Sequence, residues 1–233
     1  MAGIMGYGAF IPFTRIKVEE ILKVWGNSTL DRLKNVLNVS ERAVLQPNED
    51  TITMAVAAAK SAIEQSGIDR AKIDALFLGT CTNPYDSRPS ITVVADAIGV
   101  PGHFIGSDIQ FSGKSGTTAI QICMGLIRSR MAKFGLAIAS DTVNRHTCPG
   151  RFYEYTASAG SAAFVIGNED PLVEIIGTSS YNSDLSDFFR VEGDRYIQSI
   201  GPGGELFPAW EVGFADHVVH ASESLMKDVS LKP

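Results

Sequence analysis

The segment from Ile105 to Met131 constrains the fold more than any other, because it predicts a strand, a tight turn and a buried helix in direct succession. The turn, Ser112–Thr117, is made mostly of small residues, and a largely apolar helix follows it. Free N–H groups and the helix dipole favour an anion or a thiolate at the start of a helix. A nucleophile at position 113 would therefore have a lowered pKa. The residue there is Gly113, and a simple glycine turn between a strand and a core helix also explains the segment.

Further apolar segments alternate between strand-like and helix-like patterns along the chain. The strand-like runs lack polar alternation, which is typical of strands buried on both faces. The helix Ile52–Ser66 is preceded by capping residues and is stopped by Gly67. Together these patterns predict an α/β protein with a mainly parallel sheet. The expected strands are Gly3–Phe10, Ile73–Thr80, Phe104–Ile109, Phe134–Ser140, Ala157–Ile166 and Leu172–Ser180, and the other expected helices are Ile16–Trp25, Leu30–Leu37, Ile91–Ile98, Ser115–Met131 and Trp210–Lys227.

The composition of the chain argues against several classes of function. A net charge of −6 argues against a nucleic-acid partner, which would need a basic face. The three cysteines, Cys81, Cys123 and Cys148, are too few for a disulfide framework and lack the spacing of a zinc site, so we expect no metal. Cys123 lies among apolar residues of the central helix and is expected in the core. Because no apolar run approaches the length of a membrane span, we expect no membrane contact and a cytoplasmic protein.

Two polar segments are candidates for a ligand site. The first, Cys81–Pro89, directly follows an expected strand, and open α/β sheets bind ligands at the carboxyl ends of their strands. The second, Asn182–Phe207, has no clear periodicity. Its run Gly201–Gly204 predicts a turn rather than a phosphate-binding loop, because no strand precedes it.

Several motifs together resemble the thiolase superfamily of condensing enzymes, and within it the 3-hydroxy-3-methylglutaryl-CoA (HMG-CoA) synthase group. The resemblance implies a thiolase-like layered α/β fold with a buried central helix, of which this chain covers the N-terminal half. Residues 1–181 would form the N-terminal domain, and residues 182–233 a loop and helix leading into an absent C-terminal half. The motifs are GYGAFIPFTRIKVEEILKVWG, EDTITMAVAAAKSAI, LGTCTNPYDSRPS, DIQFSGKSGTTAIQICMGLI, AIASDTVN, PGRFYEYTASAGSAAFVIG and GDRYI.

A narrower set of motifs is similar to the A subunits of bacterial monoacetylphloroglucinol acetyltransferases. These motifs are ERAVLQPNEDTIT, LGTCTNPYDSR and FSGKSGTTAIQIC. In that group a synthase-like chain works beside a thiolase-like subunit and a small OB-fold subunit. The resemblance therefore implies an oligomer, either a homodimer or a heteromer with thiolase-like and OB-fold subunits. It also implies a coenzyme A thioester as the substrate, with no other cofactor required.

The resemblance locates the family's catalytic residues, and this chain departs from the family at each of them. The nucleophilic cysteine of the family corresponds to Gly113, and its general-base glutamate corresponds to Cys81. The family's histidine and asparagine come from the second half of the fold, before which this chain ends. No intact catalytic set is therefore expected.

Other residues could substitute for the missing groups. Ser112 neighbours the vacant nucleophile position, but adjacent side chains on an extended segment point in opposite directions. Ser115 lies in the first turn of the helix, where a capping role is usual. Cys81 is either a reactive thiol at a strand end or an inert buried one. His146 and Cys148 are a further candidate pair, although two residues on an irregular loop need not face each other.

Three functions are compatible with these assignments. In the first, the chain is a non-catalytic, nucleophile-less subunit of an acyltransferase or condensing-enzyme complex of the HMG-CoA synthase type. In the second, it is an acyl-CoA-dependent acyltransferase or synthase that uses Cys81 or a serine, and Arg88, Lys114 or Arg151 meets the anionic groups of CoA. In the third, it is a truncated, inactive gene product.

The central helix also predicts association with a partner. Between Thr118 and Ile127 the only large polar side chain is Gln121, so we expect the helix to be apolar around most of its circumference. Its own sheet can cover one face of the helix. Each Leu, Ile or Met side chain left exposed on another face loses about 1.5–3 kcal/mol of the stabilisation that its burial would give. We therefore expect a partner surface to cover the remaining apolar face.

Overall fold

The computed structural model describes residues 2–184, 188–199 and 213–230, and a mixed six-stranded sheet forms its centre. The strands are β1 (Gly3–Phe10), β4 (Ala75–Gly79), β5 (Ile105–Ile109), β6 (Gly135–Asp141), β7 (Gly160–Gly167) and β8 (Val173–Glu174). Their order is β5-β4-β6-β7-β1-β8. Strand β4 pairs in parallel with β5 and β6, whereas β7 is antiparallel to β6 and β1, and β8 is antiparallel to β1. Four of the six strands therefore run in the same direction, as the mainly parallel pattern predicted.

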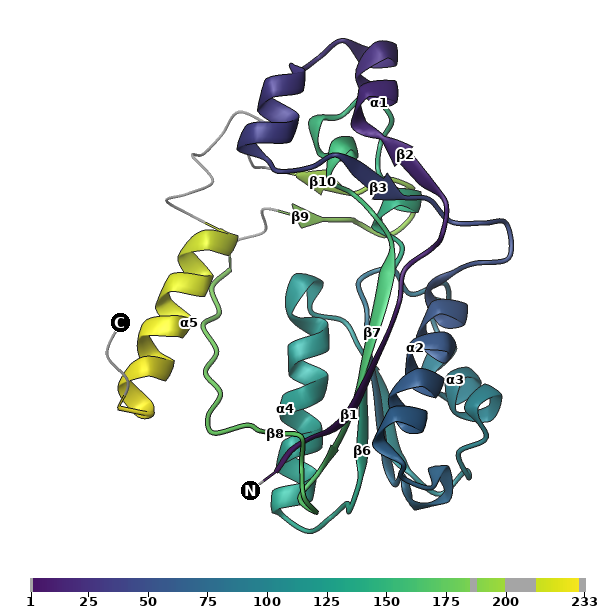
Figure 1. The fold of residues 1–233 in the computed structure, drawn as a ribbon, viewed down its shortest axis with the longest axis vertical. Coiled ribbons are helices and arrows are strands. Elements are labelled where there is room, and N and C mark those ends of the chain that lie inside the picture. Colours follow the sequence, from purple (N-terminus) through teal and green to yellow (C-terminus); the bar gives the residue numbers. More distant parts are fainter. Residues whose placement is uncertain (1, 185–187, 200–212, 231–233) are drawn as a thin grey trace.

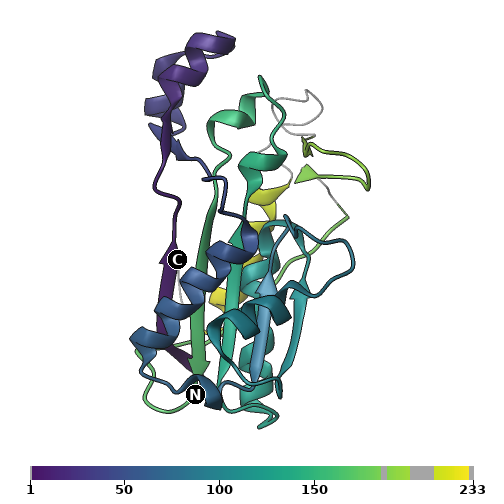
Figure 2. The ribbon, with the colours of Figure 1, turned by 90° about the vertical axis from the view of Figure 1, so that its right-hand side faces the viewer.

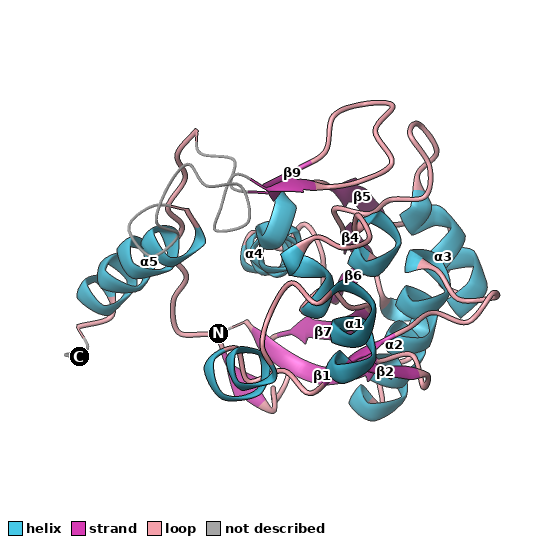
Figure 3. Ribbon diagram, turned by 90° about the horizontal axis from the view of Figure 1, so that it is seen from above, coloured by secondary structure: helices cyan, strands magenta, loops and turns pink. Residues whose placement is uncertain are grey.

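Helices cover both faces of this sheet. In the described residues the α-helices are α1 (Val18–Trp25), α2 (Thr51–Ser66), α3 (Ser90–Ile98), α4 (Ser115–Arg128) and α5 (Phe214–Asp228). Helices α2 and α3 lie on one face, and α4 lies on the other (Figure 1). Helix α5 lies on the α4 side, farther from the sheet (Figure 3). The fold is therefore a layered α/β arrangement with α4 between the sheet and the segment that leads to α5.

A small cap projects beyond one end of the sheet (Figure 2). It contains α1, the π-helical turn Arg32–Val36, and the paired strands β2 (Arg15–Lys17) and β3 (Glu41–Ala43). Its own apolar core includes Leu33 and Tyr155, both fully buried. The two short helices expected between residues 16 and 37 are therefore present, the second as a π-helical turn.

Strand β4 shows how a continuous apolar run becomes buried on both faces. Leu76 and Leu78 belong to the core on the α2 and α3 side, whereas Ala75 and Phe77 belong to the core on the α4 side. Neighbouring side chains of a strand point to opposite faces, so helices on both sides are needed to bury them all. The predicted burial of this strand on both faces is confirmed.

The ends of α2 confirm the predicted capping signals. The Asp50 carboxylate accepts the backbone N–H of Thr53, and the Thr53 hydroxyl in turn accepts the N–H of Asp50. This reciprocal capping box satisfies two N–H groups that have no partner inside the helix. At the other end, Gly67 has φ +66°, a left-handed conformation that suits glycine.

The predicted strand Leu172–Ser180 is wrong in length, because β8 pairs only two residues with β1. Beyond Glu174 the chain leaves the sheet and packs on α4 instead. Arg128 donates a hydrogen bond to the backbone oxygen of Ile175, and the Gln121 amide donates one to the Ser180 hydroxyl. Later in the chain, the polar segment contains a short pair, β9 (Phe188–Phe189) with β10 (Gln198–Ser199). The expected turn Gly201–Gly204 and the expected helix start at Trp210 lie outside the described residues.

The expectation of a largely apolar exposed face on α4 is also wrong. Ile120, Ile122 and Leu126 are half-buried, and they pack in one core cluster with Ile175. The segment after β8 had been expected to be part of the sheet. Instead it packs in the same cluster as these side chains. Within the described residues, the exposed positions of α4 are instead small or polar: Thr117, Gly125 and Arg128.

Candidate functional site

The turn before α4 is held by Ser115 and by a close backbone approach. It forms the 3-10 turn η3 (Ser112–Lys114). The Ser115 hydroxyl donates to the Ser112 carbonyl at 2.8 Å and accepts the Phe111 N–H at 2.9 Å. A Cβ at Gly79 would lie 2.4 Å from the Ser115 carbonyl, so glycine is required where β4 approaches the start of α4. Ser115 is therefore structural, and Gly113, the expected nucleophile position, lies in the turn directly before α4.

Gly113 has open space around it. It is exposed, its φ lies outside the left-handed region, and an added Cβ would meet no described atom within 4 Å beyond its chain neighbours. It opens onto a cavity of about 770 Å³ between the start of α4, the segment 179–183 and α5. A larger side chain would fit at this position, but glycine itself provides no nucleophile. Other residues that line the cavity include Phe111, Lys114, Gln121, Tyr181, Asn182, Phe188, Phe214 and Val218.

Ser112 lines the same cavity, and the alternation of side chains expected for an extended segment does not apply to it. The reason is that the turn is a 3-10 turn rather than an extended segment. Ser112 has φ +45°, a left-handed conformation that is costly for a residue with a side chain. Within the described residues, its hydroxyl has no hydrogen-bonded base. The geometry therefore does not activate Ser112.

Ser183 and His217 form a pair in this cavity that sequence reasoning missed. The Ser183 hydroxyl lies 2.7 Å from Nε2 of His217, and both residues line the cavity beside Gly113. The ring of Tyr181 packs against His217 with 5.5 Å between centroids. A serine hydroxyl bonded to an imidazole is the pairing of a nucleophile with a base. No local pattern marks it, because Ser183 lies in an irregular segment and His217 lies on α5, 34 residues away.

Cys81, which the resemblance assigned to the base position, is hydrogen-bonded to Asp141 at the end of β6. One carboxylate oxygen of Asp141 accepts the N–H of Cys81 at 2.8 Å and its thiol at 3.3 Å. The same oxygen accepts the hydroxyls of Thr80 and Thr82 at 2.9 and 2.8 Å. Burial, followed by the nearby charge of Asp141, raises the pKa of Cys81 to about 12. Because the thiolate is the reactive form, this geometry favours an inert thiol.

The other cysteine candidates also have structural surroundings. Cys123 is fully buried, and burial raises its pKa to about 12. The Cys148 thiol lies 3.8 Å from the backbone oxygen of Pro149, whereas Nδ1 of His146 lies 3.1 Å from the backbone oxygen of Arg195. Among the described contacts, the thiol and the imidazole therefore do not form the candidate pair, as the irregular loop allowed.

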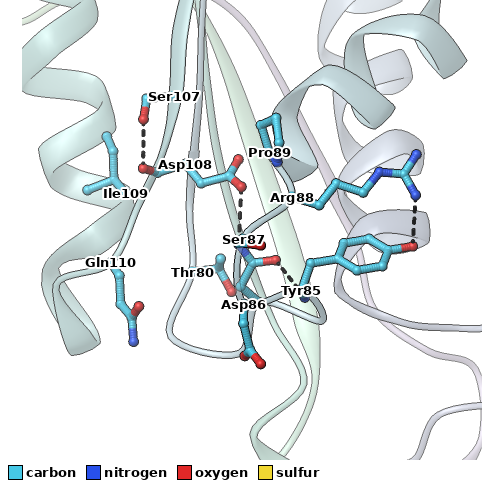
Figure 4. Close-up of a pocket in the computed structure, with 11 residues that line it drawn as sticks. Thr80, Tyr85, Asp86, Ser87, Arg88, Pro89, Ser107, Asp108, Ile109 and Gln110 are labelled. Atoms are coloured by element: carbon cyan, nitrogen blue, oxygen red, sulfur yellow. Dashed lines mark hydrogen bonds between the residues drawn. The ribbon is translucent and has the colours of Figure 1, made fainter. Parts of the chain in front are cut away.

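The loop after β4 is anchored by Asp108 on β5 (Figure 4). The Asp108 carboxylate accepts the N–H groups of Ser90 and Ile91 at 2.6 and 2.8 Å, which caps the start of α3. It also accepts the Asn83 side-chain amide at 3.1 Å. This set of bonds holds the polar loop against the sheet edge.

The basic residues expected to meet CoA lie apart. Arg88 stacks on Tyr85, with its guanidinium carbon 5.0 Å from the ring centroid (Figure 4). Lys114 lies 2.7 Å from the Asn182 amide oxygen and lines the 770 Å³ cavity. The cavity of about 370 Å³ that Arg88 lines shares no residue with it. Arg151 is exposed before the 3-10 turn η5 (Phe152–Tyr155), so the structure does not gather the three side chains at one site.

Within the part of the chain that the structure describes, no cluster of three or more His, Cys, Asp or Glu side chains is placed to hold a metal ion. No helix of that part combines the length and the apolar character needed to cross a membrane.

Comparison with curated sequences identifies relatives over the whole chain. No protein-family model matches it. The hydroxymethylglutaryl-CoA synthase of Methanocaldococcus jannaschii is 43% identical over 233 residues, which are 100% of this chain and 65% of that protein. The synthase of Methanopyrus kandleri is 43% identical over 231 residues, which are 99% of this chain and 64% of that protein. The chain thus spans slightly less than two thirds of the length of these relatives.

Solved structures show the same fold at low sequence identity. The 3-oxoacyl-[acyl-carrier-protein] synthase III of Aquifex aeolicus matches with a TM-score of 0.86 and 19% identity, covering 100% of this chain and 73% of its own. An HMG-CoA synthase complexed with CoA matches with a TM-score of 0.84 and 18% identity, covering 99% of this chain and 57% of its own. The chain is therefore a homologue of the hydroxymethylglutaryl-CoA synthases, with a thiolase-like α/β fold.

Proposed function

We propose that this chain is a subunit of an acyl-transferring or condensing complex of the HMG-CoA synthase type, in which another chain supplies the nucleophile. Gly113 carries the proposal, because it leaves the position that corresponds to the family's nucleophile without a side chain beside a large cavity. At the position that corresponds to the base, Cys81 is a high-pKa thiol bound to Asp141. Neither position supplies the group that thioester condensation requires.

Two surfaces support a role in a complex. Strand β5 is an edge strand, and its residues Ile105–Ser107 are exposed. Unpaired backbone groups at such an edge can pair with another chain. On α4, a Cβ at Gly125 would meet no described atom within 4 Å beyond its own helix and neighbours, so another helix could approach closely there. We propose a second copy of this chain, or a thiolase-like chain with an OB-fold subunit, as the partner.

The proposed substrate of the complex is a coenzyme A thioester. One structural neighbour was solved in complex with CoA. In this chain the cavity beside Gly113 has apolar walls that include Phe111, Phe188 and Val218, with the cationic Lys114 at the turn. Cavities of this size with mainly apolar walls and a few polar groups are typical of small-molecule sites.

A second candidate function, acyl transfer by this chain itself, is favoured by the Ser183–His217 pair. In that reaction the Ser183 oxygen would attack the thioester carbonyl and give its proton to Nε2 of His217. The C–S bond would break, the acyl group would remain on Ser183 as an ester, and the thiolate would take up the proton. The 2.7 Å contact satisfies the distance requirement for this step.

Intact-mass measurement after incubation with acetyl-CoA separates the two functions. For the subunit proposal we expect no acetyl adduct on this chain, alone or beside its partner. An adduct that disappears in Ser183→Ala but persists in Ser180→Ala would contradict the subunit proposal and establish the serine-based alternative. Ser180 is the matched control because it lines the same cavity and its hydroxyl bonds to Gln121 rather than to a histidine. Size-exclusion chromatography of the co-expressed chains tests the partner directly.

A further inference from the structure

A separate polar cavity of about 320 Å³ lies between the start of α2, the loop after β4, the 3-10 turn η4 (Val143–His146) and Arg190. Thr51 and Thr82, with exposed fractions of 1% and 2%, form part of its lining. A neighbouring cavity of about 560 Å³ shares Asn83, Asp86 and Arg190 with it. Apart from Pro84, the lining residues carry hydroxyl, amide, imidazole or charged groups, which suit a polar ligand.

Arg145 and Arg190, which line this cavity, have no carboxylate partner within the described residues. Arg145 donates to the backbone oxygen of Glu49 at 2.8 Å, and Arg190 donates to that of Asp194 at 2.9 Å. A guanidinium has five N–H donors. Most donors of both arginines are therefore available to a ligand.

The positive charges converge on His146. Burial lowers the pKa of His146, its hydrogen bond to Arg195 opposes this, and the charges of Arg190, Arg145 and Arg195 lower the pKa further. These charges act on one imidazole, so the guanidinium groups create a local positive potential in a chain of net charge −6. Such a confined cluster suits a small anion, whereas a polyanion would need an extended basic face.

Two carboxylates also line the cavity and limit its affinity for an anion. The Asp50 carboxylate is engaged in capping α2 through the N–H of Thr53. Asp86 is exposed on the loop and lines both neighbouring cavities. An anion between the arginines would be repelled by Asp86, which provides an internal test of the site.

We propose that Arg145 and Arg190 bind the carboxylate or phosphate group of a small anionic ligand in this cavity. Guanidinium groups form charge-assisted, often bidentate hydrogen bonds with both kinds of oxyanion. The inference goes beyond the proposed subunit function and does not require it, because the cavity shares no residue with the one beside Gly113.

Isothermal titration calorimetry at low ionic strength tests this site with two probes, pyrophosphate and succinate. We expect one molar equivalent of at least one probe to bind, and the better probe shows whether the natural group is a phosphate or a carboxylate. Arg145→Gln and Arg190→Gln should each weaken binding about tenfold, because each removes charge-assisted hydrogen bonds. Asp86→Asn should strengthen binding several-fold by removing the repulsion. Circular dichroism of each variant checks that it is folded.

Arg88→Gln is the matched control. Arg88 is an exposed arginine on the loop after β4, and it lines a different cavity. Binding to Arg88→Gln should equal that of the wild-type protein. The proposal is overturned if neither probe binds at millimolar concentration, or if Arg88→Gln weakens binding as much as Arg190→Gln. Weaker binding by Asp86→Asn would overturn it as well.

Discussion

Positions 113 and 81, which the family resemblance assigns to the nucleophile and the base, differ in how their surroundings are filled. Around Gly113 there is open space, and a new side chain would meet no described atom beyond its neighbours. Around Cys81, one oxygen of Asp141 accepts four hydrogen bonds, two of them from Cys81 itself. A catalytic side chain could therefore be restored at position 113 with little rearrangement. At position 81 a carboxylate would have to displace an established network.

The largest expected difference concerns thiol reactivity at position 81. With a pKa of about 12 instead of the ordinary 9.0, Cys81 has a thiolate fraction about a thousandfold lower near pH 8. A high-pKa thiolate is more nucleophilic, which offsets part of this loss. We expect alkylation of Cys81 by iodoacetamide to be at least about thirtyfold slower in the native protein than in urea, as measured by peptide mass spectrometry. Cys123 is the internal reference for a thiol whose pKa is raised by burial alone. Equal alkylation rates of Cys81 in the native and the unfolded protein would contradict the network.

Removing the carboxylate at the centre of this network should have the next largest effect. Asp141→Ala leaves the hydroxyls of Thr80 and Thr82 and the N–H of Cys81 without this acceptor. We expect the free energy of unfolding to fall by about 3 kcal/mol or more, measured by urea denaturation. The exposed Asp86→Ala is the control and should change stability by less than about 0.5 kcal/mol. Similar losses in both variants would show that the Asp141 network is not stabilising.

Restoring a carboxylate at the base position should destabilise the protein in a pH-dependent way. In Cys81→Glu, burial and the Asp141 charge should raise the folded-state pKa of the new carboxyl above its unfolded value. The protonated form then folds best, so stability is retained at acid pH and is lost as the pH rises through the folded-state pKa. We expect a loss of about 2–4 kcal/mol at pH 7 relative to the neutral control Cys81→Gln. Identical pH profiles of urea denaturation for the two variants would refute this.

The smallest effect is expected at the open position. Gly113→Cys should change the free energy of unfolding by less than about 1 kcal/mol, because its backbone conformation suits other residues and space is available. The new thiol should have a lowered pKa at the start of α4, measured from the pH dependence of its alkylation. We expect no condensation or acyl transfer, because one restored member of a catalytic set recovers little rate. Measurable turnover of acetyl-CoA by this variant would contradict the assignment of the missing groups.

Local signals in the sequence predicted the elements that depend on local physics. Asp50 and Gly67 marked the two ends of α2, since capping and a left-handed stop involve only neighbouring residues. The apolar run of β4 indicated a strand buried on two faces, because it lacks polar alternation. The motifs around Gly113 and Cys81 indicated the family, and the comparisons with known proteins confirmed the fold.

Contacts between distant segments were outside the reach of these signals. The pattern of residues 172–180 indicated a strand, but the chain leaves the sheet after Glu174 and covers the side of α4 that had been expected to need a partner. Both errors have the same cause, because periodicity shows that a side chain is buried without showing what buries it. The residues of the Ser183–His217 pair, and the arginines around His146, likewise come from segments that are far apart in sequence.

The sequence by itself determined the order of the main strands and helices, the glycine at position 113 and the cysteine at position 81. Only the tertiary structure decided that Gly113 has open space and that Cys81 is bound to Asp141, 60 residues away. The physical reason is that residue type and local pattern set the conformational preference of the backbone and the kinds of reaction that a side chain can perform. Burial, charge and hydrogen bonding, which control whether a side chain can react, depend on neighbours that only the fold brings into contact.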